Sequence, residues 1–151
     1  MTSQPTPGRA EQISTRIVFF IAGIGMAAWA PLVPFAKARA QIDDGMLGLL
    51  LLCLGAGSIV AMPLAGALSA RLGCRTVITV SSILLAVALP FLATLSNLPG
   101  LMISLLAFGA GVGSLDVSMN VQAVIVERAS GKTMMSGFHG MFSLGGIAGA
   151  A

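Results

Sequence analysis

The sequence predicts an all-α protein that crosses a membrane several times, and three observations support this class. Apolar residues make up 56% of the chain and charged residues only 9%, whereas a soluble domain carries about 25% charged residues. The apolar residues gather in stretches of roughly 20 residues, the length that a helix needs to cross a hydrocarbon core. No segment alternates apolar and polar residues as the strands of a membrane β-barrel do. A surface this apolar requires the lipid bilayer as its solvent.

The stretches follow one another along the chain. Residues 1–15 contain prolines, a glycine and polar residues, and this composition predicts a flexible tail. The apolar stretches are residues 17–36, 46–70, 76–95, 101–126 and 133–151. The last is still apolar at Ala151, so we expect this chain to be the N-terminal part of a longer protein. A signal peptide cleaved after Ala30 is disfavoured, because Pro31 would directly follow the cut.

The distribution of charge predicts the orientation of these stretches. The basic residues expected on one side of the membrane are Arg9, Arg16, Arg71, Arg75, Arg128 and Lys132. The other side carries Lys37 and Arg39, which Asp43 and Asp44 offset. Because cytoplasmic loops carry the excess of lysine and arginine, the N-terminus is predicted to be cytoplasmic. The pI near 9.5 therefore reflects topology, and no nucleic-acid partner is expected.

The second stretch carries two local signals. The sequence QIDDG before it offers Asp43 or Asp44 as the residue that caps the helix N-terminus. Small residues, which allow helices to pack closely in lipid, recur within it at Gly55, Gly57, Ala61, Ala65 and Gly66. Cys53 lies in this stretch and Cys74 in a predicted loop, so no disulfide between them is expected.

The fourth stretch contains a carboxylate, Asp116, within the segment GVGSLDVSMNVQAVIVER. At 3.6 residues per turn, one helical stripe comprises Gly109, Gly113, Asp116, Asn120 and Glu127. We expect the glycines to leave the outer part of this stripe open and the polar residues to line its inner part. The other face carries residues suited to helix packing, namely Ala107, Gly111, Ser118 and Ile125.

The depth of Asp116 suggests a role in function. It lies eleven residues before Glu127, or roughly 16 Å along a helix, which is near the bilayer midplane. An ionisable residue inside a membrane is costly and marks a functional site by default. One interpretation is that Asp116 binds and releases a proton as its surroundings change. The other is that it only hydrogen-bonds a neighbouring helix.

His139 and Trp29 are further candidates for contact with a solute. His139 lies about 10 Å into the fifth stretch, at the depth of Asn120 in the antiparallel fourth stretch, so the two side chains can meet. It either contacts solute and relays protons or only packs. Trp29, the one tryptophan, is either an interfacial belt residue or a platform on which a ligand ring stacks.

Motifs for catalysis and metal binding are missing from the sequence. Ser136 and His139 lie three residues apart but lack the G-x-S-G context of an intramembrane serine protease. The chain has no H-E-x-x-H motif, no P-loop and no spacing typical of a metal cluster. We therefore predict no enzymatic activity, no cofactor and no metal site.

The loop between the second and third stretches resembles a known family signature. In GALSARLGCRTV, residues 66–77, Gly66, Arg71, Gly73 and Arg75 match the signature loop of the major facilitator superfamily. Ala70 stands where that family usually has aspartate, which affects the charge pairing expected on the cytoplasmic side. The segment from Trp29 to Arg75 and the segment GSLDVSMNVQAVIVER are similar to the bacterial fucose-permease-like branch.

This resemblance implies a fold and a function. Complete family members have twelve spans in two six-helix halves, so the chain would supply helices one to four and part of five, with the C-terminal half as partner. The implied activity is secondary transport of a small, sugar-like solute with protons across the bacterial inner membrane. Asp116 would couple protons, and Asn120, His139 and Trp29 would contact solute. The alternative is a channel-like or non-transporting protein that uses its polar stripe for helix assembly.

Overall fold

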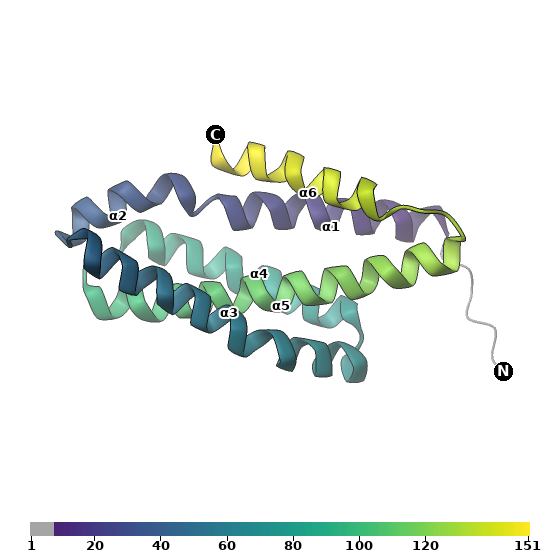
Figure 1. The fold of residues 1–151 in the computed structure, drawn as a ribbon, viewed down its shortest axis with the longest axis horizontal. Coiled ribbons are helices and arrows are strands. Elements are labelled where there is room, and N and C mark those ends of the chain that lie inside the picture. The colour runs from purple at the N-terminus through teal and green to yellow at the C-terminus, as the bar shows by residue number, and fades with distance from the viewer. Residues whose placement is uncertain (1–7) are drawn as a thin grey trace.

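The computed structural model describes residues 8–151, which form an elongated bundle of helices (Figure 1). The helical elements are α1 (Arg9–Ala27), the 3-10 turn η1 (Ala30–Leu32), α2 (Val33–Ala40), α3 (Asp44–Leu72), α4 (Cys74–Thr94), α5 (Leu98–Ser130) and α6 (Met135–Ala150). No strand occurs in these residues, so the all-α prediction is confirmed. α1 begins at Arg9, so residues 9–15 are helical where composition predicts a flexible tail; the rest of that tail, residues 1–7, lies outside the described part.

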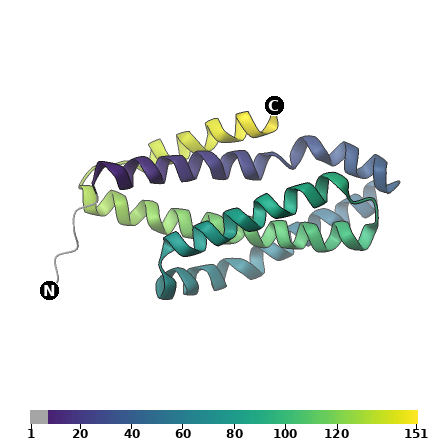
Figure 2. The same cartoon turned by 180° about the vertical axis from the view of Figure 1, so that it is seen from behind.

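The helices have the length and composition of membrane spans. Within the described residues, four helical stretches are long and apolar enough to cross a bilayer; they are Arg9–Ala40, Asp44–Leu72, Cys74–Thr94 and Leu98–Ser130. The start of α1, the α3–α4 connection and the α5–α6 connection lie at one end of the bundle, here called the N-terminal end (Figures 1 and 2). The α2–α3 and α4–α5 connections lie at the opposite end. The chain therefore passes back and forth along the long axis.

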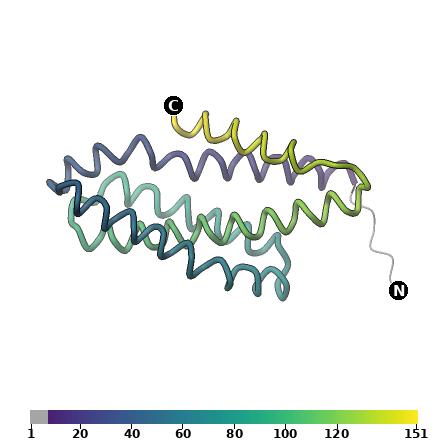
Figure 3. Tube along the Cα trace, viewed as in Figure 1, coloured from purple at the N-terminus to yellow at the C-terminus, as the bar shows by residue number. Residues whose placement is uncertain are grey.

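The first span is interrupted between α1 and α2, as the Cα trace in Figure 3 shows. Pro31 and Pro34 lie in the first turns of η1 and α2, where a missing backbone N–H costs little. α2 ends at Gln41, which has a left-handed backbone with φ of 52°. Asp43 then accepts a hydrogen bond from the Met46 backbone N–H at 2.7 Å, which confirms the predicted N-cap of α3.

Two pairs of helices cross at glycines. At Gly57, Gly109 and Gly113, α3 and α5 approach so closely that an added Cβ would collide with the backbone of the partner helix. α1 and α6 cross in the same way at Gly23, Gly145 and Gly149. The contacts repeat in both pairs: a glycine lies against the backbone carbonyl of the residue three positions before the glycine of the other helix. These carbonyls belong to Leu54 and Leu106 in the α3–α5 pair and to Phe20 and Phe142 in the α1–α6 pair. Close backbone approach at small residues is the usual basis of helix packing in lipid.

The helix α4 is held against α5 and α2. The Leu85 side chain fills the space over Gly111, where an added Cβ would lie 3.0 Å from the leucine Cδ2. At the opposite end, Arg39 donates hydrogen bonds to the Leu92 and Leu95 carbonyls at 2.8 and 2.9 Å. The last carbonyls of a helix lack partners within the helix, and a cationic side chain there is favoured by the helix dipole. Arg39 therefore ties α2 to the end of α4.

Candidate functional site

Asp116 and Asn120 form a half-buried polar pair near the middle of α5. The Asn120 Nδ2 donates to the Asp116 backbone carbonyl at 2.9 Å and to its Oδ1 at 3.3 Å. Asp116 lies roughly 27 Å from Leu98 and roughly 21 Å from Ser130 along the helix. The other carboxylate oxygen, Oδ2, accepts no hydrogen bond from any residue of 8–151. The pair therefore keeps an acceptor available at mid-depth.

The arrangement of α3 explains why this pair remains accessible. At Gly109 and Gly113, α3 covers the stripe that also carries Asp116. Farther along, α3 contacts the other face of α5, where the Ser69 hydroxyl donates to the Ser118 hydroxyl at 3.0 Å. Helix α3 thus crosses over α5 and leaves the Asp116 side before reaching it.

This crossing corrects one expectation and supports another. The glycine part of the stripe is not open, because the Leu54 and Ser58 backbones of α3 fill the space that the missing side chains leave. On the predicted packing face, Gly111 meets α4 and Ser118 bonds α3, as expected. Ile125, on that face near the C-terminal end of α5, is exposed.

His139 does not meet Asn120. Its ring packs edge-on against Phe19 of α1, with centroids 5.5 Å apart, and within residues 8–151 no hydrogen bond joins it to Asn120. The reason is the glycine crossing at Gly145 and Gly149, which brings α6 against α1 rather than against α5. His139 remains exposed, so a role in solute contact stays a prediction.

Trp29 is buried just beyond the end of α1, with only 5% of its surface exposed. This burial contradicts the interpretation of an interfacial belt residue, which would face the lipid headgroups. Its indole Nε1 is buried without a hydrogen-bond partner in the described structure. The stacking interpretation stays a prediction.

Glu127 has a role that the sequence did not indicate. Its Oε2 accepts hydrogen bonds from the Met134 and Met135 backbone N–H groups at 2.6 and 2.7 Å. α6 begins there without a cap from its own N-cap residue, so Glu127 supplies the cap across the connection.

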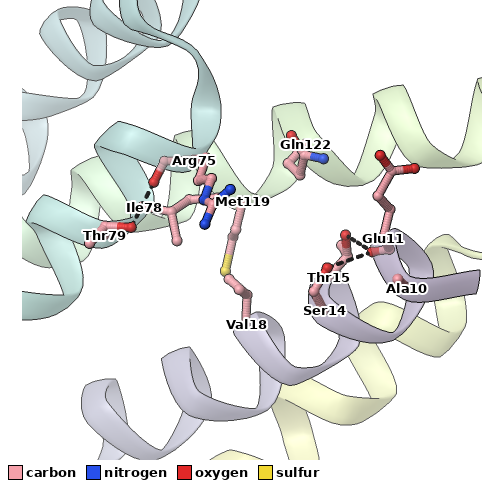
Figure 4. A pocket seen from close by; sticks show the side chains of 10 residues that line it. All are labelled: Ala10, Glu11, Ser14, Thr15, Val18, Arg75, Ile78, Thr79, Met119 and Gln122. Carbon is pink, nitrogen blue, oxygen red and sulfur yellow. Dashed lines mark hydrogen bonds between the residues drawn. The ribbon is translucent and has the colours of Figure 1, made fainter. Parts of the chain in front are cut away.

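A cavity of about 590 Å³ lies between α1, α4 and α5, toward the N-terminal end of the bundle (Figure 4). Polar and charged side chains line it from each helix: Glu11, Ser14, Thr15, Arg75, Thr79 and Gln122. Neither Asp116 nor Asn120 reaches it. Gln122 is the one hint in the sequence, because it is a polar residue on a helix face that otherwise packs.

The residues of the signature loop occupy distinct places. Gly73 joins α3 to α4 with φ of 83°, a conformation that favours glycine. Gly66 approaches Val117 of α5, to which an added Cβ would come within 4.0 Å. Arg71 and Arg75 are both exposed, and Arg75 also lines the cavity.

Residues 16–151 match the family profile of the Major Facilitator Superfamily. The chain belongs to this superfamily. It is 60% identical over 144 residues to an uncharacterized MFS-type transporter of Yersinia pestis. It is 37% identical over 133 residues to the uncharacterized transporter y4wD of Sinorhizobium fredii and 37% identical over 131 residues to the membrane protein MosC of Rhizobium meliloti. No solved structure matches.

The alignments with these relatives cover most of this chain but less than half of each relative. The matched regions include 95%, 88% and 87% of the chain, and 38%, 35% and 32% of the relatives, in the same order. None of the relatives' names states a solute. The likeness thus supports a multi-pass membrane protein of the superfamily and leaves the fucose-permease-like branch as a proposal.

Proposed function

We propose that this chain forms part of a secondary transporter that moves a small, sugar-like solute together with protons by alternating access. The observation that carries the proposal is the Asp116–Asn120 pair, half-buried at mid-depth on the side of α5 that α3 leaves uncovered. Substrate sites of secondary transporters lie near the bilayer midplane. Membership of the superfamily supports the same class of activity.

The chemistry of the pair suits a proton and a polyol. A carboxylate in a membrane is costly when ionised and dry, so changing exposure to water changes its tendency to hold a proton. The Asn120 amide already donates to Oδ1 of Asp116. A sugar hydroxyl can donate to the remaining carboxylate oxygen and accept from the amide. The protonated carboxyl can both donate to and accept from a hydroxyl, so proton and solute can occupy the site together, as transport in the same direction requires.

We further propose that the working transporter contains helices beyond residue 151. This chain spans only 38% of the Yersinia pestis relative, and transporters of this kind bind solute between two repeats. Residues 1–151 alone should therefore show no solute uptake after reconstitution. Uptake by this segment at the rate of the full-length protein would contradict the proposal.

The Asp116→Asn variant tests the coupling role in the full-length protein. It keeps the size of the side chain but cannot exchange a proton, so the fold should survive. We expect uphill uptake in proteoliposomes to fall at least about tenfold, while exchange of labelled for unlabelled solute persists. Uphill uptake with unchanged magnitude and pH dependence would show that Asp116 is structural.

A channel-like or non-transporting role is the second candidate. The observation that favours it is the outer part of the stripe, where Gly109 and Gly113 serve helix contact rather than an open path. Saturable uptake that stops when the proton gradient is dissipated would support the transporter. Unsaturable flux, or none, in the full-length protein would support the second candidate.

The orientation, with the N-terminus in the cytoplasm of a bacterial cell, is also a proposal. It rests on the excess of arginine and lysine at the N-terminal end. Cys74 is a poor reporter because it is buried at the start of α4, so exposed positions are needed. In a variant without native cysteines, Lys132→Cys should react with an impermeant thiol reagent only after the cells are opened. Gln41→Cys should react in intact cells; the reverse pattern would invert the orientation.

A further inference from the structure

The first span consists of two helices, α1 and α2, joined by a weak point. In a continuous helix the carbonyls of Ala27 and Ala30 would accept hydrogen bonds from the residues four positions later, which here are Pro31 and Pro34. Proline has no backbone N–H, so neither bond can form. The Ala30 carbonyl instead accepts a bond from the residue three positions later, as part of the tighter turn η1. Residues 28–32, here called the hinge, therefore resist bending less than the helices on either side.

Beyond the hinge, few contacts hold α2 on the bundle. Ala36 is its one buried residue, and apart from η1 the element that α2 contacts most is α4. The strongest of these contacts is the pair of hydrogen bonds from Arg39 to the last carbonyls of α4, because the donor is charged. Lys37 pairs with Asp44 at the start of α3, but an ion pair this exposed contributes little. Arg39 is therefore the main restraint on the position of α2.

Trp29 lies in the hinge and makes the observed position of α2 more costly. Its indole Nε1 is covered by other residues of 8–151 and donates a hydrogen bond to none of them. A buried donor without a partner costs the free energy of its removal from water. Because the atom is already covered, a group outside residues 8–151 can reach the indole N–H only if the hinge or α2 moves.

We propose that α2 is a gate at the end of the bundle opposite the N-terminal end, hinged at residues 28–32 and held closed by Arg39 (Figure 3). In the closed position, which this structure shows, Arg39 binds the last carbonyls of α4 and Trp29 keeps an unpaired donor. In the open position α2 swings away from α4 about the hinge, Arg39 returns to water and the indole N–H gains a partner. The gain at Trp29 offsets part of the loss at Arg39, so both positions are populated. The movement takes place within this bundle and does not depend on the transport proposal.

A fixed α2 is the alternative, and the two interpretations differ in what the loss of Arg39 does. If packing alone fixes α2, Ala36 stays covered when the arginine is removed. If α2 is a gate, Ala36 becomes accessible while residues on the α1 side of the hinge stay buried. The rate at which a buried cysteine reacts with a thiol reagent follows the fraction of time for which it is uncovered, so this rate distinguishes the two.

The test measures reaction with a maleimide in the purified full-length protein, in a background without native cysteines. Ala36→Cys reports on α2, and Ala22→Cys, equally buried on the α1 side of the hinge, is the matched control. Arg39→Gln should raise the rate at position 36 at least about tenfold, the factor expected for the loss of one hydrogen bond from a charged group, and leave position 22 unchanged. Lys37→Gln, which breaks the exposed ion pair on the same helix, should change the rate at position 36 less than about twofold.

Trp29→Phe tests the opposing contribution at the hinge. It removes the unpaired donor and keeps an aromatic ring, so it should slow the reaction at position 36 about fivefold and partly reverse the effect of Arg39→Gln. Equal rates in Arg39→Gln and Lys37→Gln would overturn the gate. A rise at positions 22 and 36 together would also overturn it, because the whole bundle would then have loosened. A Trp29→Phe protein that reacts as fast as the parent, or faster, would overturn the role given to Trp29.

Discussion

The N-terminal and C-terminal halves of α5 use the same helical stripe in different ways. In the N-terminal half, Gly109 and Gly113 lie against the α3 backbone. In the C-terminal half, Asp116 and Asn120 stay half-buried and bond mainly each other. The helix and the stripe are the same; what differs is the path of α3, which crosses to the Ser118 face between the two halves.

This difference shows how one helix can serve packing and chemistry together. Glycines allow a close crossing, and a close crossing at an angle carries the neighbouring helix away over the following turns. A polar pair placed just past the crossing is then held by a firmly packed helix while one side remains accessible. The α1–α6 pair has the same glycine crossing, but in the described part no acidic residue follows the crossing on either helix.

Gly109→Ala should have the largest effect, because it disrupts the part of α5 that packs against α3. The new methyl group would collide with the Leu54 carbonyl, which is backbone and cannot rotate away. We expect a loss of about 3 kcal/mol, at the upper end of overpacking costs, measured by unfolding of the purified protein in detergent. Gly55→Ala is the matched control on α3, where no atom lies within 4 Å of the added Cβ; it should be neutral or slightly stabilising. Equal losses in the two variants would contradict the crossing.

Asn120→Ala should have an intermediate effect, confined to the accessible half. It removes the amide that bonds Asp116 but no hydrogen bond to another helix in the described structure, so the free energy of unfolding should change little. We expect the solute concentration for half-maximal uptake to rise about tenfold, as for the loss of one polar contact. Remaining uptake should stay proton-coupled. Val121→Ala, an exposed neighbour off the stripe, should alter neither property; a loss of stability in Asn120→Ala instead would make Asn120 a packing residue.

Ser118→Ala should have the smallest effect, and it tests where α3 passes from one face of α5 to the other. It removes the partner of the buried Ser69 hydroxyl, and hydrogen bonds between membrane helices average about 0.6 kcal/mol. A double-mutant cycle with Ser69→Ala should recover a coupling free energy of this size. The control pair Ser69→Ala and Ser82→Ala should show none, because Ser82 has no bond to Ser69 in the described structure. A coupling near zero for the first pair would place α3 elsewhere.

The sequence by itself determined the class and several local features. Long apolar stretches in lipid must satisfy their own backbone hydrogen bonds, so they are helices whatever their neighbours do. The cap at Asp43 depends on residues only three apart, and the stripe through Asp116 depends on helical period alone. The signature loop from Gly66 to Arg75 indicated the superfamily, because its glycine and arginine spacing lies within one short hairpin.

Only the tertiary structure decided which helices meet. It placed α6 on α1, and so His139 beside Phe19 instead of Asn120. It also buried Trp29, gave Glu127 the N-terminus of α6 to cap, and brought Arg75 into a cavity with Glu11. Hydrophobicity does not select partners in a bilayer, since lipid tails are as apolar as leucine. Partner choice depends on which small residues align across two helices, and that alignment is set by residues far apart in the chain.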